Sequence, residues 1–166
     1  MRVAVILCAA LLAASCDKEE RSPAEQARMD EEDVAAVNAA QVPPPVPVTP
    51  DRITFTDVEK HDMFGAGCNF APGTGIAPIA LLQSERGFMK IDGRVVVLAP
   101  DAGSGDLPLG AKGKYTGGAW SIVLDLSAEE GKQSGSETVN YPARFVLRNE
   151  RDQVVFESNG TAQCGS

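Results

Sequence analysis

Hydrophobic and polar positions follow four successive patterns along this chain. Residues 3–14 form an apolar run, residues 17–33 are mostly charged or polar, and residues 42–50 are rich in proline and valine. From residue 51 onward, short apolar-polar alternations are separated by glycine, asparagine and aspartate. An alternation with a period of two is typical of half-buried β-strands, so residues 51–166 are predicted to form the folded domain.

The clearest predicted element is a β-hairpin. Residues 88–91 and 94–98 are its strands, and Asp92-Gly93 between them can take the positive φ angles of a type I′ turn. The other strands are expected at residues 53–58, 79–83, 120–126, 143–148, 153–158 and 161–164, with turns at Gly117-Gly118, at 149–152 and at Asn159-Gly160. Many short strands with no helix among them indicate an all-β fold, a single small antiparallel β-sandwich or barrel.

Two further expectations concern this domain. Its core should contain the large apolar residues of the predicted strands, namely Phe55, Val97, Trp120, Ile122, Leu124, Phe145 and Phe156. Pro142 has no N–H to donate to a central ladder, so the strand that contains it should lie at a sheet edge or carry a bulge there.

Residues 16–50, which precede the domain, are interpreted as an acidic, proline-rich tether. Their charged part has too few large apolar side chains to fold on its own. Ser22-Pro23-Ala24-Glu25 predicts a helix start, with a serine cap and a glutamate three residues later. A helix from there to Gln41 would have little to bury, so we expect it to be partial in isolation. Residues 42–50 should be extended and span roughly 28 Å.

The first residues have the layout of an export signal. Arg2 precedes the apolar run, and small residues lead to a cysteine in the order Leu12-Ala13-Ala14-Ser15-Cys16. This order resembles the lipobox of bacterial lipoproteins, with Ala13 where the strongest form of the motif has leucine. The resemblance implies that residues 1–15 are a signal peptide that is removed, and that the thiol of Cys16 is acylated. The mature protein would then be held on a membrane of the bacterial cell envelope, facing the periplasm.

Two alternatives to this interpretation remain open. The leader could be an ordinary secretory peptide, or it could be an uncleaved anchor. An apolar run of this length is well short of the roughly 20 residues that span a bilayer, which disfavours the uncleaved anchor.

The four cysteines divide between these parts. Cys8 would leave with the signal peptide and Cys16 would carry lipid, so Cys68 and Cys164 remain. Export places them in an oxidising compartment, and we expect them to form a disulfide, contributing on the order of 4–5 kcal/mol in the chain-entropy model. A redox-active or metal-binding pair is the alternative, which the absence of a Cys-x-x-C motif disfavours.

Charge limits the classes of partner. The chain carries a net charge of −8. Residues 17–50 hold eight acidic and three basic side chains, and residues 51–166 hold fifteen and eleven. Without a basic face, nucleic acid is an unfavourable partner, and an envelope protein attracted by charge would be cationic.

Candidate chemistry is sparse. His61 is the only histidine, and no Gly-x-Ser-x-Gly nucleophile motif accompanies it, so we interpret it as a solvated loop residue. Asp101-Ala102-Gly103-Ser104-Gly105-Asp106 offers oxygen ligands of the kind that Ca²⁺ prefers, but too few of them, and a surface turn is the simpler interpretation. We therefore predict no catalytic residue, no metal and no cofactor.

One loop has a short resemblance to a known family. Gln133-Ser134-Gly135-Ser136-Glu137, followed by Tyr141, is similar to the Ser-Gly-Ser-Gly-x-x-Tyr loop of bacterial lipoprotein inhibitors of c-type lysozyme, which are small disulfide-bonded β-barrels. Glu137 replaces the last glycine, and Tyr141 is one residue too distant.

Taken together, these features predict a membrane-anchored envelope lipoprotein with a non-enzymatic binding or scaffolding β domain. Inhibition of a cationic cell-wall-attacking enzyme and an envelope enzyme are the alternatives.

Overall fold

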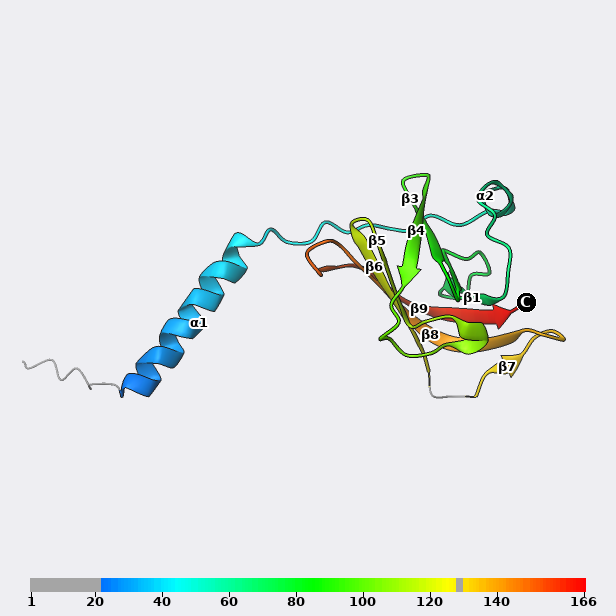
Figure 1. Ribbon diagram of the computed structural model, residues 1–166. Helices are drawn as coiled ribbons and strands as arrows, with labels where there is room; N and C mark the ends of the chain where they lie inside the picture. Colours follow the sequence, from blue (N-terminus) through cyan, green and yellow to red (C-terminus); the bar gives the residue numbers. More distant parts are fainter. Residues whose placement is uncertain (1–21, 128–129) are drawn as a thin grey trace, which may run out of the picture. The chain divides into compact units, whose positions relative to one another are not determined.

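The computed structural model describes residues 22–127 and 130–166 of the chain (Figure 1). The predicted signal peptide and Cys16 lie outside the described residues. The chain divides into two compact units between Pro43 and Pro44, and each unit is described by itself.

The first unit contains one helix, α1 (Pro23–Gln41). Its start is the predicted one, because the Ser22 hydroxyl accepts a hydrogen bond from the Glu25 N–H at 3.3 Å and the Glu25 carboxylate accepts one from the Ser22 N–H at 3.2 Å. Pro23 occupies the first helical position, where its missing N–H costs nothing. No residue of α1 is buried, as expected for a helix with few large apolar side chains.

The second unit is a β-barrel. Its strands are β1 (Gly67–Pro72), β2 (Ala80–Gln83), β3 (Gly87–Ile91), β4 (Arg94–Pro100), β5 (Lys114–Gly117), β6 (Trp120–Leu126), β7 (Lys132–Gln133), β8 (Val139–Arg148) and β9 (Val154–Gly165). Neighbouring strands are antiparallel in the order β6-β5-β4-β3-β2-β1-β9-β8-β7. An additional pairing of β6 with β8 closes eight of these strands into a barrel, and β7 is an extra strand on β8. The predicted all-β antiparallel fold is confirmed, in its barrel form.

Packed side chains fill the interior of this barrel. Phe70 from β1 stacks on Phe145 from β8 with ring centroids 5.1 Å apart, and Phe156 from β9 meets Phe145 edge-on at 6.2 Å. The buried Tyr115 keeps its hydroxyl bonded, because it donates to the Gln83 carbonyl at 2.6 Å. The interior cluster also contains Cys68, Leu82, Met89, Leu98, Ile122, Leu124, Leu147, Ala162 and Cys164. A closed barrel of eight strands is just wide enough for side chains to fill it, and here they do.

Several local predictions are confirmed. Strands β3 and β4 pair around Asp92-Gly93, both with positive φ. Strands β8 and β9 pair as expected on either side of the polar loop.

The prediction for Pro142 is wrong, because its strand β8 pairs with β9 on one side and with β6 and β7 on the other, and so does not lie at an edge. The proline is tolerated because it lies one residue beyond the last β6–β8 register pair, where its carbonyl still accepts the Ser127 N–H. The bulge in β8 lies elsewhere, between Leu147 and Arg148.

The strand predicted at residues 53–58 is wrong. The structure has a short helix, α2 (Phe55–Lys60), at this position. Thr54 caps it by accepting the Asp57 N–H, and the Asp57 carboxylate accepts the Thr54 N–H at 2.8 Å. This reciprocal cap gives the backbone N–H groups of Thr54 and Asp57 local acceptors and so favours a helix start. The apolar-polar alternation of residues 53–58 gives no sign of it. Phe55 is therefore not a core residue, since 68% of its surface is exposed. Val97 on β4, also expected in the core, is 57% exposed.

Helix α2 and the residues around it cover part of the outer barrel wall. Ile53 and Met63 flank the helix and pack with Phe88 of β3 in a second buried cluster. Val58, Leu81 and Val95 pack against this cluster. The outer face of β3 is therefore apolar and covered together with the neighbouring parts of β2 and β4, whereas Val97 further along β4 stays exposed. This covering explains why the strand at 88–91 is buried almost throughout rather than at alternate positions.

The turn predicted at Asn159-Gly160 is also wrong, because β9 runs through it without interruption. Gly160 allows the backbones of β9 and β1 to lie close together, and it forms no turn. A Cβ atom at this position would lie 2.1 Å from the Ala71 carbonyl oxygen of the neighbouring strand. Glycine in a strand interior is typical of such backbone contacts.

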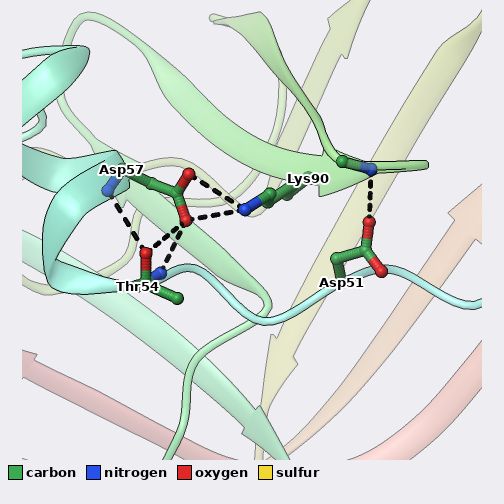
Figure 2. A network of polar contacts seen from close by, with 5 residues as sticks. Asp51, Thr54, Asp57 and Lys90 are labelled. Carbon is green, nitrogen blue, oxygen red and sulfur yellow. Dashed lines mark hydrogen bonds and ion pairs between the residues drawn. The ribbon is translucent and has the colours of Figure 1, made fainter.

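A polar network fastens the α2 segment to the β3–β4 hairpin (Figure 2). Lys90 of β3 donates to both carboxylate oxygens of Asp57 at 2.9 Å, and only 17% and 15% of the two side chains are exposed. Asp51 accepts the Gly93 N–H at 2.7 Å, and its own N–H donates to the Lys90 carbonyl. The hydrogen bond from the Thr54 backbone, and then the Lys90 ammonium group, hold the pKa of Asp57 well below its usual range.

This network predicts an acid-dependent contribution to stability. Because the pKa of Asp57 is lower in the folded state, its contribution is fully present above the ordinary aspartate pKa of about 3.9 and is lost as the pH falls through the folded-state value. Asp57→Asn should therefore lower the melting temperature at neutral pH, and its deficit relative to wild type should shrink steadily below pH ~4. Thermal melts by circular dichroism measure this. Glu59→Gln, on the same helix and exposed, is the matched control. A deficit that stays constant down to pH ~2 would contradict the assignment.

Candidate functional site

The strongest candidate site is an open cleft at one end of the barrel, here called the end cleft. The register places Gly67 of β1 opposite Gln83 of β2 and Gly165 of β9, so three strands end together there. The cleft has a volume of about 220 Å³. Its lining consists of Met63, Gly65, Gly67, Cys68, Asn69, Leu81, Leu82, Gln83, Thr138, Gln163, Gly165 and Ser166.

One half of a disulfide, Cys68, lines the end cleft. Cys68 of β1 and Cys164 of β9 are register partners, with Cα atoms 4.0 Å apart, and the structure joins them as the sequence predicts. Both side chains are buried in the interior cluster. The bond therefore links the first and last strands of the barrel at the end where the cleft lies.

Glycines set the shape of the cleft. A Cβ atom on Gly67 would lie 2.2 Å from the Leu82 carbonyl oxygen, and one on Gly165 would lie 2.8 Å from the Thr138 hydroxyl. Any side chain at Gly67 would force β1 away from β2, because the conflict is with backbone. These positions keep the three strands close and leave the mouth of the cleft unobstructed.

Carboxamide side chains form a row across the outer wall beside the cleft. Asn69 of β1 is the register partner of Gln163 of β9, which is in turn the partner of Asn140 of β8. Their neighbours along each strand, such as Phe70 and Ala162, belong to the interior cluster, so the three amides face outward. Asn69 and Gln163 line the end cleft, and Asn140 continues the row beyond it.

The segment after α2 forms one rim of the cleft. Gln83 donates through its side-chain nitrogen to the carbonyls of Met63 and Phe64, at 2.9 and 3.1 Å. These bonds hold the rim in place. Phe64 lies between two lining residues, Met63 and Gly65, and 56% of its surface is exposed. Its ring meets that of Phe55 edge-on, with centroids 6.4 Å apart.

The loop with the short resemblance noted above forms the opposite rim. Residues 133–137 are exposed, and they begin with the last residue of β7 and continue into the connection to β8. The loop closes on itself, because the Ser134 N–H donates to the Thr138 carbonyl at 2.9 Å and the Gln133 side chain donates to the Gly135 carbonyl. Ser166, which lines the cleft, donates to the Glu137 carboxylate at 2.8 Å. The loop therefore stands beside the end cleft.

The other candidate residues from the sequence are not among those that line this cleft. His61 is exposed and ends α2, its N–H bonded to the Asp57 carbonyl. In the 101–106 loop, Asp106 is ion-paired with Lys112 and Asp101 lies 3.7 Å from the Lys114 ammonium group. Lysine partners on both carboxylates disfavour a Ca²⁺ site. Within residues 22–127 and 130–166, no group of three or more His, Cys, Asp or Glu residues could hold a metal ion.

Comparison of the chain with protein-family models, with curated proteins and with solved structures finds no match. Among the helices that the structure describes, none has both the length and the apolar character needed to cross a membrane.

The disulfide should contribute substantially to stability. Ninety-six positions separate the two cysteines, and loss of a native disulfide costs a small secreted domain about 2–5 kcal/mol. The double variant Cys68→Ala, Cys164→Ala should lower the free energy of unfolding by this amount in a denaturant titration. A reductant should destabilise the wild-type chain comparably and leave the double variant unchanged. Equal stability of the oxidised and reduced wild-type chain would show that the bond contributes nothing.

Proposed function

We propose that the chain is a bacterial envelope lipoprotein, anchored through acylated Cys16, whose barrel is a non-enzymatic binding module. The leader and its lipobox resemblance support the anchor. Acyl chains contribute about 0.8 kcal/mol for each buried methylene group, so two or three of them hold a protein on a bilayer effectively permanently. The bilayer is thus the first partner of this chain.

The observation that best supports a binding role is that the interior of the barrel is filled with side chains, whereas one end of the barrel has an open cleft. Aromatic and aliphatic side chains occupy the inside of the barrel, so a ligand has to be bound on the outside. The end cleft offers uncharged polar groups on a rigid frame of paired strands and a disulfide. Preformed clefts with a few convergent polar groups are the usual form of binding sites.

The region before the barrel suits a spacer between anchor and module. At 1.5 Å per residue, α1 is about 28 Å long, and all its residues are exposed. Residues 43–50 have no regular secondary structure, as expected for the proline-rich stretch. Val48 already belongs to the barrel unit, since its N–H donates to the Val155 carbonyl at 3.0 Å.

The anchor is tested by Cys16→Ala. This variant should lose membrane attachment or retain its leader, because acylation of the cysteine is what directs leader removal in the proposed pathway. Fractionation of cells, detergent-phase partitioning and the mass of the mature protein measure this. Cys8→Ala is the matched control and should behave as wild type, since that residue lies in the predicted signal peptide. Normal cleavage with detergent-phase partitioning in Cys16→Ala would contradict the lipoprotein assignment.

A second candidate function is inhibition of a cationic cell-wall-attacking enzyme. The loop at 133–137 favours it, because this loop is exposed, is braced by its own hydrogen bonds and stands at the rim of the end cleft. The net charge of −8 would attract a cationic enzyme.

Inhibition requires that the full chain slow lysis of a bacterial cell-wall suspension by a c-type lysozyme at a near-equimolar ratio. Ser134→Ala combined with Ser136→Ala should then abolish the effect, while Ser104→Ala, in a distant loop, should leave it intact. Undiminished lysis at a large excess of the chain would reject this second function without affecting the anchor.

A further inference from the structure

We propose that the end cleft binds a neutral saccharide chain, with the amides of Asn69 and Gln163 as its hydrogen-bonding groups and the ring of Phe64 as a stacking surface. This inference rests on the proposed binding function and names the class of its ligand.

The two amides are free to bind. A carboxamide offers an acceptor oxygen and two N–H donors in one plane, which match neighbouring hydroxyl groups on a sugar ring. Within the described residues, neither Asn69 nor Gln163 has a hydrogen bond from its side chain to another protein group, whereas Gln83 is committed to the rim. Opposite positions on adjacent strands lie about 5 Å apart, a separation that brings both amides to one ligand unit.

The lining disfavours an anionic ligand, and so does the Glu137 carboxylate bonded to Ser166 at the rim. None of the side chains that line the end cleft is that of Asp, Glu, Lys, Arg or His. A phosphate or carboxylate ligand would be desolvated there without a cationic side chain to compensate, which is unfavourable. Hydroxyl groups need no such compensation, because each can donate to an amide oxygen and accept from an amide nitrogen.

The aromatic pair supplies the apolar part of the site. The faces of a pyranose ring carry C–H groups that pack well against a flat aromatic surface, and large exposed aromatics are otherwise disfavoured on a soluble domain. Phe64 is exposed and lies in the chain between Met63 and Gly65, which line the cleft, and its ring meets Phe55 edge-on. Amides beside an exposed aromatic ring thus provide both kinds of contact that a sugar requires.

An extended peptide fits this cleft less well. A peptide usually binds a sheet by adding a strand to a free edge. Here β1 pairs with β2 on one side and β9 on the other, and β9 pairs with β1 and β8, so the strands beneath the cleft have no free edge. The recognition groups at this end are side chains, as in saccharide sites.

The test uses the full-length protein in a detergent without sugar headgroups. Chitotetraose, cellotetraose and maltotetraose are the neutral probes, and tetragalacturonate is the charged one. At least one neutral probe should bind saturably, shift the side-chain NH₂ signals of Asn69 and Gln163 in NMR spectra, and bind at least tenfold more tightly than tetragalacturonate. The probe that binds best identifies whether N-acetyl groups or plain hydroxyls are preferred.

Variants locate the site. Asn69→Ala, Gln163→Ala and Phe64→Ala should each weaken binding about five- to tenfold, which is the loss of one or two neutral hydrogen bonds or one stacking contact. Asn159→Ala, on the same outer face of β9 but outside the cleft, and Ile76→Ala, an exposed apolar residue elsewhere, are the matched controls. All five should melt within a few degrees of wild type, because none of these side chains is buried.

Three results would overturn the inference. The first is that no neutral probe binds at about 10 mM, a concentration at which a site with a millimolar Kd is mostly filled. The second is binding that the three variants leave unchanged. The third is equal affinity for the neutral probes and for tetragalacturonate. None of them bears on the anchor, which is measured separately through Cys16. If the anchor fails while saccharide binding persists, the inference stands for a protein that is secreted in another form.

Discussion

Closure of the barrel is the constraint on which the rest of this structure depends. Two pairings, β6 with β8 and β1 with β9, join strands that are distant in the sequence. Because of them, each of the eight barrel strands has a neighbouring strand on both sides. Closure removes the unpaired N–H and C=O groups that make open sheets prone to association. It also determines the diameter, and eight strands leave an interior that Phe70, Phe145, Tyr115 and their neighbours fill completely. Binding therefore has to use the outer wall or the ends.

Two parts of the outer wall differ chemically. The first is the apolar part of β2, β3 and β4, which the segment around α2 covers with a second small core and the Asp57–Lys90 pair. A short helix is enough for this, because the polar network of Figure 2 fixes the covering segment to the β3–β4 hairpin. The second lies over β1, β9 and β8, which carry the amide row and, further along the strands, the ion pair between Arg144 and Glu157. The amide row is the part that we propose for a ligand.

Structural features that are determined by residues close together in the sequence could be predicted, whereas features determined by contacts between distant residues could not. The Asp92-Gly93 hairpin and the Ser22 helix cap are determined by residues a few positions apart, and both were predicted correctly. At residues 53–58 two local signals competed, and the Thr54–Asp57 cap prevailed over the apolar-polar alternation. Asn159-Gly160 looks like a turn, but Gly160 is required by contact with β1, almost ninety positions earlier in the chain. Contacts of this kind cannot be read from local composition.

The end cleft shows the same division. The disulfide partners could be predicted by elimination among four cysteines, whereas Asn69 and Gln163 have no motif and come together only through the register of β1 with β9. That same register places Cys68 opposite Cys164, one position away from each amide. The bond that stabilises the barrel therefore also fixes the backbone positions from which the two amides project, so a ligand has to order only their side chains. For a shallow cleft with few contacts, avoiding the cost of ordering the backbone as well favours binding.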